Sequence, residues 1–221
     1  ELVKVPIVPA AKNLIIDSTF LTIDKKLLKG YADVDYKGYF GSDMYNSLLY
    51  NKGDDERVYA RRRMAKGSNK FIMSDYKISY PDPVNKSTNI RSNFEIPDYV
   101  KSIDDEIYVN LNLEKIFAGS IIDTAKRKIA VEIDYLYNIK QVHVLKIPAG
   151  YAVDHLPKNV SVSNKLVDFS IEYKQVNDQV IATQDYVMKA LYIDVPDFNE
   201  WNDALQKVSP AYKEEIVLKK K

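Results

Sequence analysis

The sequence predicts a mostly β fold of antiparallel, sandwich-like sheets, with a helical-pair insertion near residues 42–66 and a C-terminal helix near 197–208. Three observations predict this class. Apolar and polar residues alternate along most of the chain, as in strands that have one solvated face. Seventeen tyrosines stand against seven glycines, and tyrosine favours half-buried strand positions. Helical spacing is confined to two short regions.

Four segments show the alternation most clearly, and each predicts a set of apolar side chains that faces the core. These sets are Ile72, Tyr76, Ile78 and Tyr80; Ile107, Val109, Leu111 and Leu113; Ile129, Val131, Ile133, Tyr135 and Tyr137; and Val167, Phe169, Ile171 and Tyr173. Two further segments predict hairpins, which turn at residues 24–26 and at residues 177–178.

The helical regions carry recognisable start and stop signals. Ser42 is the predicted N-cap of the first helix, and residues 54–66 have acids in the first turn and bases in the last. Near the C-terminus, Asp197 and Glu200 have the spacing of a capping box, and Pro210 ends the helix. The apolar stripe of this helix is Phe198, Trp201, Leu205 and Val208, and the strand-like "EEIVLKK" follows it.

A length of 221 residues suits one large domain or two small ones. We expect residues 1–12 to be a linker from an upstream region and residues 13–113 to form a first β-rich part that contains the 42–66 insertion. Residues 114–126 interrupt the strands and are the candidate boundary before a second β-rich part at 127–221. The two parts form either two domains or one continuous domain.

The composition excludes several classes of partner and site. A net charge of +1 gives no broad attraction to a polyanion, so we expect no nucleic-acid partner. The chain has no cysteine, which removes disulfides, thiolate nucleophiles and cysteine metal ligands. No apolar run approaches the length of about 20 residues that spans a bilayer, so we expect no membrane span.

Catalytic motifs are missing from the sequence, which contains neither a glycine-rich phosphate loop nor a metal-binding or nucleophile signature. His143 and His155 lie on different predicted strands without a ligand set nearby, so we interpret both as structural or surface residues. We therefore predict no catalytic, cofactor-binding or metal-binding residue, no bound cofactor, and no enzymatic activity for this chain.

Charged clusters have two interpretations. The basic run Arg61–Arg63, together with Arg57 and Lys66, either grips a phosphate-rich partner or forms a solvated helix end. Helical spacing spreads these side chains around the axis, which favours the solvated end. The acids at Asp33 and Asp35 and at residues 104–106 lack the spacing of a calcium loop, and we predict that they are solvated.

The tyrosines and Trp201 would suit a sugar-binding platform if their rings were exposed. Trp201 lies on the apolar stripe of its helix, however, and the tyrosines fall into the inward-facing sets of the strands. We therefore predict that these rings belong to the core.

The stretch "KIPAGYAVDHLPKNVSV" places Pro148 and Pro157 at either end of a short strand-like piece. Proline cannot donate to a sheet ladder, so each should end or bend a strand at a sheet edge, and Gly150 permits the turn. We predict a corner where the chain switches from one sheet to another, with His155 at its rim.

This corner resembles the C-terminal β-rich domain, of unknown function, found in bacterial transglutaminase-like proteins. The matching residues are Ile147, Pro148, Gly150, Tyr151, Val153, Leu156 and Pro157. Further landmarks are the hairpin "LTIDKKLLKGYADVDYKGYF", Arg127 ahead of "IAVEIDY", and the closing "YKEEIVLKK", so the resemblance covers roughly residues 13–221. The sequence departs from the family pattern in having Asp24-Lys25-Lys26 at the hairpin turn and Ala130 where a proline is expected.

The resemblance implies a non-catalytic accessory module that packs on, or controls access to, an upstream transglutaminase-like or papain-like core of the same chain. It also implies an extracytoplasmic location, in the periplasm or at the cell surface. A glycan- or peptide-binding β-sandwich module is the alternative, and it requires an exposed aromatic platform or an open edge strand.

Overall fold

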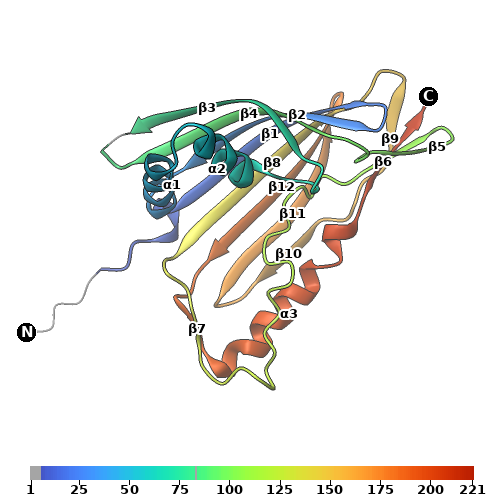
Figure 1. The fold of residues 1–221 in the computed structure, drawn as a ribbon. Coiled ribbons are helices and arrows are strands. Elements are labelled where there is room, and N and C mark those ends of the chain that lie inside the picture. Colours follow the sequence, from blue (N-terminus) through green and yellow to red (C-terminus); the bar gives the residue numbers. More distant parts are fainter. Residues whose placement is uncertain (1–5, 83) are drawn as a thin grey trace, which may run out of the picture.

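A computed structural model describes residues 6–82 and 84–221 and shows a mostly β fold built on one large sheet (Figure 1). The order of its strands is β10-β11-β12-β8-β1-β2-β4-β3, and all neighbours are antiparallel except β1 and β8, which are parallel. These strands are β1 (Leu14–Asp24), β2 (Leu27–Tyr36), β3 (Ile72–Asp82), β4 (Ser87–Ile96), β8 (Tyr137–Lys146), β10 (Val160–Ser163), β11 (Val167–Val176) and β12 (Gln179–Met188). The predicted fold class is confirmed.

Two smaller sheets and three short turns complete the fold. A four-stranded sheet has the order β5-β6-β14-β9, and a two-stranded one pairs β13 with β7. Their bounds are β5 (Lys101–Ile103), β6 (Glu106–Val109), β7 (Val131–Glu132), β9 (Tyr151–His155), β13 (Tyr192–Ile193) and β14 (Ile216–Lys220). Short 3₁₀ turns occur at Ala10–Lys12, Val195–Asp197 and Ala211–Lys213.

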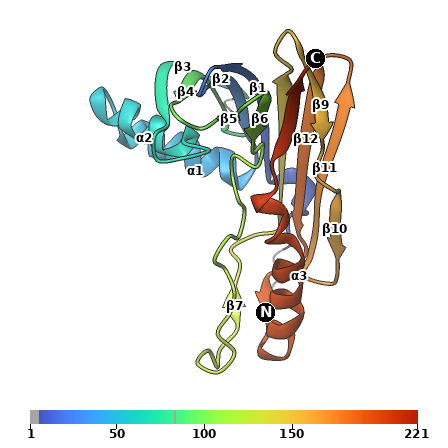
Figure 2. The ribbon, with the colours of Figure 1, turned by 90° about the vertical axis from the view of Figure 1, so that its right-hand side faces the viewer.

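The helices cover one face of the large sheet, here called the inward face. Figure 2 shows α1 (Tyr39–Tyr50) and α2 (Asp54–Met64) beside the β3 end, and α3 (Phe198–Val208) beside the β10 end. The inward-facing side chains of both ends, among them Val34, Ile90, Ile171 and Tyr186, belong to one hydrophobic cluster. The opposite face of the sheet is here called the outer face. None of the described helices is both long and apolar enough to cross a membrane.

The predicted turns and the strand-switching corner are confirmed. Lys25 and Asn177 adopt left-handed backbone conformations (φ 58° and 54°) at the two hairpin turns. After β8 the chain leaves the large sheet, turns at Gly150 (φ 84°), contributes β9 to the four-stranded sheet, and returns as β10. His155 ends β9 with its side chain exposed.

Both predicted helical regions are present, but two predicted caps are wrong. The first helix begins after Gly38 instead of Ser42, because Asn13 Oδ1 accepts the Tyr39 N–H (3.1 Å) and fixes an earlier start. Gly38 has φ 63°, and a Cβ there would lie 2.2 Å from the Lys12 carbonyl oxygen. At α3, Asp197 already has a helical backbone and makes no side-chain cap, since its carboxylate accepts a hydrogen bond from Lys165 Nζ (2.5 Å).

Two predicted strand patterns are also corrected. A bulge between Met73 and Tyr76 shifts the register of β3, so Met73 is buried and Ile72 is 53% exposed. The strand expected over residues 128–137 shrinks to β7 and the start of β8, and Ile129 is exposed. Here Arg127 donates to the carbonyl oxygens of residues 129 and 130 (3.0 Å each), which removes acceptors that a strand ladder would use.

Candidate functional site

Polar side chains replace apolar ones at the centre of the inward face. The strand register places Asp17 of β1 beside Gln141 of β8, and Thr19 beside His143. Gln184 of β12 pairs with Gln141 from the other side. All five residues have exposed fractions of 2% or less. Because buried polar groups are costly unless they are satisfied, this cluster is the feature of the core that most needs a physical account.

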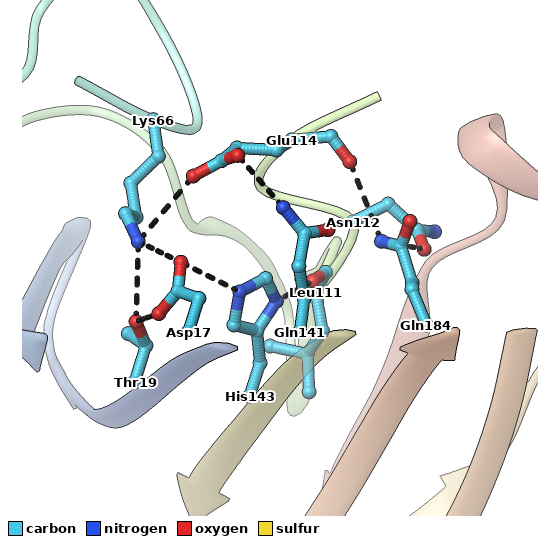
Figure 3. A network of polar contacts seen from close by, with 9 residues as sticks. All are labelled: Asp17, Thr19, Lys66, Leu111, Asn112, Glu114, Gln141, His143 and Gln184. Carbon is cyan, nitrogen blue, oxygen red and sulfur yellow. Dashed lines mark hydrogen bonds and ion pairs between the residues drawn. The ribbon is translucent and has the colours of Figure 1, made fainter. Parts of the chain in front are cut away.

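Lys66 is the second residue after α2, and its side chain extends into the cluster (Figure 3). Its ammonium group forms an ion pair with the Asp17 carboxylate and lies 3.3 Å from Thr19 Oγ1 and 3.4 Å from Glu114 Oε1. Thr19 in turn donates its hydroxyl proton to Asp17 Oδ1 (2.6 Å). The buried ammonium group is therefore surrounded by oxygen atoms on three sides.

This placement corrects the prediction for the basic run. Arg57 and residues 61–63 are exposed on α2 as expected, whereas only 4% of Lys66 is exposed. The helix ends at Met64, and the Gly67 N–H then binds the Leu113 carbonyl oxygen (2.7 Å), which turns the chain inward. Gly67 has φ 75°, a conformation that glycine adopts at low cost.

A loop that follows β6 closes the cluster from above. His143 donates its Nδ1–H to the Leu111 carbonyl oxygen (2.7 Å), because a carbonyl can only accept. Asn112 donates to the Tyr173 hydroxyl (2.7 Å) and accepts from Gln184 Nε2 (3.1 Å). Glu114 accepts from Gln141 Nε2 (2.7 Å). Residues 111–114 thus fasten this loop to β8, β11 and β12.

The charges within the cluster set one another's protonation states. Burial alone would raise the pKa of Asp17, but the charge of Lys66 and the contact with His143 hold it below its ordinary value. Burial alone would lower the pKa of Lys66, but the Asp17 and Glu114 carboxylates raise it. Partial desolvation raises the pKa of Glu114, whose side chain is still 37% exposed; the Asp17 carboxylate adds to this shift and the Lys66 charge opposes it. Asp17 and Lys66 are therefore an ionised pair, and Glu114 accepts a proton most readily.

A cleft of about 200 Å³ gives solvent access to one side of the cluster and is lined by Asp17, Lys66, Glu114, Arg63 and Tyr36. Asp17, Lys66 and Glu114 each have an opposite charge or a donor as partner, whereas the buried Nε2 of His143 and Oε1 atoms of Gln141 and Gln184 have no hydrogen-bond partner among the described residues. Within residues 6–82 and 84–221, no group of three or more His, Asp or Glu side chains is placed to hold a metal ion. The arrangement is suited to joining α2, the 111–114 loop and the central strands.

Glu114→Gln should change how stability depends on pH. A carboxyl whose pKa is raised in the folded state contributes stability that is fully present below its unfolded pKa of about 4.3 and is lost as pH rises through the folded pKa. The wild type should therefore lose stability relative to the variant as pH rises from about 4.3 through the folded pKa of Glu114, because glutamine does not titrate. Urea unfolding of both proteins across this range measures the difference. Parallel stability curves would contradict the shift.

The sequence contained a usable signal for this cluster. In β1 the core-facing phase of the alternation runs through Ile15, Asp17, Thr19 and Leu21, so two polar residues stand where apolar ones are expected. In β8 the same phase contains Gln141 and His143. The other residues considered do not join the cluster: the solvent-facing Asp33 and Asp35 both accept from Asn89 Nδ2 (2.6 and 3.1 Å) on the outer face.

A second candidate surface lies on the outer face of the large sheet. Phe20 of β1 and Tyr31 of β2 are direct cross-strand partners and are 52% and 37% exposed. They border a hollow of about 400 Å³, here called the outer-face hollow, whose rim also includes Thr22, Lys29, Asn93, Val144, Lys146 and Gln179. The prediction that the tyrosines face inward is therefore wrong for Tyr31, and it is also wrong for Tyr80 of the first predicted core-facing set and for Tyr39, Tyr50 and Tyr192, which are all exposed.

Comparison with known proteins gives one finding on the family. No curated protein matches the chain. Residues 105–218 match the model of a family described as "Domain of Unknown Function with solved-structure structure" (DUF3858). The match spans more than half of the chain and runs from the β5–β6 turn into β14, so that it includes α3 and the corner around β9. The chain therefore belongs to the DUF3858 family.

Proposed function

We propose that this chain is a non-catalytic accessory module that packs on, or controls access to, an upstream transglutaminase-like core. The uncovered outer face of the large sheet is the observation that supports this most directly. Phe20 and Tyr31 are exposed there, and the row continues through the partly buried Val144 and Ile181 on the next two strands. A continuous apolar row on a sheet face that none of the described helices covers is typical of a surface that meets a partner.

The chemistry of the chain supports a non-catalytic role. Transglutaminase and papain-type reactions need a thiolate activated by histidine, and the chain contains no cysteine. Its buried charges at Asp17 and Lys66 neutralise each other. The resemblance to the C-terminal region of transglutaminase-like proteins supplies the identity of the expected partner and an extracytoplasmic location, in the periplasm or at the cell surface.

A glycan-binding module is the second candidate, and the composition of the outer-face hollow supports it. Exposed Phe20 and Tyr31 rings offer stacking surfaces for a sugar, and the amides of Asn93 and Gln179 on the rim offer hydrogen bonds to hydroxyl groups. The same hollow could instead bind an extended peptide with apolar side chains.

Two substitutions at Phe20 separate the candidates. Packing on a core requires apolar area, so Phe20→Leu should preserve binding to a separately produced transglutaminase-like core, while Phe20→Asp should abolish it. Sugar stacking requires a ring, so both variants should lose binding on a glycan array. Isothermal titration calorimetry measures binding of each variant to the transglutaminase-like core. Ile129→Asp is the matched control, because Ile129 is exposed but lies away from the outer face.

The full-length gene product provides the first decisive observation. The proposal expects the full-length protein to contain a Cys-His-Asp core ahead of Glu1. A gene product without such a core, or a core whose binding is unchanged by Phe20→Asp, would remove the accessory-module proposal. Loss of glycan binding in both Phe20 variants would instead establish the second candidate.

A further inference from the structure

A small apolar cavity lies between α3, the inward side of β11 and β12, and the segment 116–121. Its volume is about 130 Å³, and its walls include Val167, Phe169, Tyr186, Ala204 and Tyr212. Ile116 stands between this cavity and the polar cleft around Lys66, since it lines both. Apolar cavities of about 150 Å³ in proteins stay dry and bind molecules of the size of benzene. The cavity is therefore of a size that suits a single ring.

Phe117 forms the wall between this cavity and a larger, open hollow of about 550 Å³ that also includes Ile121 and Trp201. The Phe117 ring centre lies 4.6 Å from that of Tyr186 and 5.1 Å from that of Trp201. Its backbone has φ 61°, a left-handed conformation that is unfavourable for a bulky residue. A residue with a strained backbone thus stands where the open hollow meets the inner cavity.

The segment around Phe117 is anchored on both sides. Before it, the Tyr212 hydroxyl donates to the Ile116 carbonyl oxygen (2.7 Å). After it, the Trp201 indole N–H donates to the Ser120 carbonyl oxygen (3.0 Å), and Asn202 exchanges two hydrogen bonds of 2.8 Å with the backbone of Ile122. Between these anchors, Gly119 has no neighbouring atom within 4 Å of a Cβ position. The hydrogen bonds that hold this segment therefore lie on either side of Phe117 and do not involve its ring.

We propose that this cavity is a binding site for a compact, uncharged molecule with one aromatic ring, which enters from the open hollow past Phe117. The walls present rings at inclined angles: Phe169 lies 5.8 Å from Tyr186 at 61° and 6.1 Å from Tyr212 at 77°. Aromatic rings favour such edge-to-face partners. A charged substituent would lose its hydration without gaining a counter-ion in this lining, so charged analogues are rejected.

Titration of the wild-type protein with toluene tests the site, with benzoate as the charged control. Toluene should raise the melting temperature saturably and change the fluorescence of Trp201, which is the chain's one tryptophan and contacts Phe117. Benzoate should do neither. A wild-type protein that shows no saturable response to toluene overturns the proposal, and so does a benzoate response equal to that of toluene.

Two variants locate the binding. Ala204→Leu places a larger side chain in the cavity and should abolish the toluene response; Val208→Phe, at another lining position, serves if the first variant does not fold. Phe117→Ala removes the gate and should speed association in stopped-flow fluorescence. If both Ala204→Leu and Val208→Phe bind toluene as well as the wild type does, toluene binds outside this cavity. Binding seen in Phe117→Ala alone would mean that only an engineered cavity binds. Either result overturns the site, and neither bears on the proposed partner of the outer face.

Discussion

Replacing Lys66 by methionine should lower the free energy of unfolding by about 3–5 kcal/mol, because it leaves the Asp17 carboxylate buried without its counter-charge. Asp17 is 2% exposed, and the ammonium group of Lys66 forms its ion pair. Thr19 and His143, the other nearby groups, supply a hydroxyl donor at 2.6 Å and an imidazole nitrogen at 4.0 Å. Neither compensates for the lost ammonium group. Urea unfolding at pH 7 measures the change.

Two control proteins make this result specific to the buried pair. Lys66→Met combined with Asp17→Asn removes both charges and should recover much of the loss, since uncharged replacements of a buried pair are often neutral. Lys70→Met breaks an exposed ion pair with Asp98 (2.7 Å) and should change stability far less, because solvent screens this pair. A cost for Lys66→Met no larger than that for Lys70→Met would contradict the account of the cluster.

The ion pair also sets the pH range in which it stabilises the fold. The pKa of Asp17 is lowered on folding, so its contribution is present above the unfolded value of about 3.9 and is lost as pH falls towards the folded value. The pKa of Lys66 is raised, so its contribution is present below the unfolded value of about 10.4 and is lost as pH rises through the folded value. Across the range between them, the pair stabilises the folded state.

Trp201→Ala should lower the free energy of unfolding by about 3–5 kcal/mol through the cavity that it leaves. The indole is 3% exposed, lies edge-on to Phe117 (5.1 Å, 80°), and donates its N–H to the Ser120 carbonyl oxygen. The prediction that this residue belongs to the core is confirmed by its burial. The mutation should therefore loosen both α3 and the segment that it anchors.

Trp201→Phe is the matched variant, because it keeps a ring in place and loses the indole N–H. It should cost less than Trp201→Ala, with the lost hydrogen bond accounting for about 1 kcal/mol. Thermal and urea unfolding of the two variants give the comparison. An unchanged melting temperature in Trp201→Ala would show that the ring stabilises little and would contradict the packing derived from its burial.

Local patterns predicted those parts of the fold that depend on neighbours in sequence. A few adjacent residues determine each of these parts, which are the turns near Lys25 and Asn177, the final strand and the corner at Gly150. The strand order, in contrast, depends on residues that are far apart in the sequence. The parallel pairing of β1 with β8, for example, places Leu14 beside Asn138. Alternation gives the face of each strand but not its neighbour, so this pairing could not be predicted from one sequence.

The candidate site was missed for a related reason. Helical spacing groups Lys66 with the arginines of α2, but the helix ends at Met64, and the turn at Gly67 directs the lysine side chain inward. Glu114 lies in the segment expected to be a boundary, where no pattern indicates a contact with Lys66. Polar residues in the core-facing phase of β1 and β8 were visible in the sequence. Their partners became known only from the tertiary structure.

The parallel seam between β1 and β8 also governs the order in which the chain can fold. The hairpins β1–β2 and β11–β12 close over short turns, so they can form early, whereas the seam must wait until a long intervening segment has closed. Before then, β1 and β8 each present an unpaired edge in what will become the middle of the sheet, and such edges template aggregation. The most vulnerable intermediate is therefore one in which both half-sheets are complete and the seam is still open.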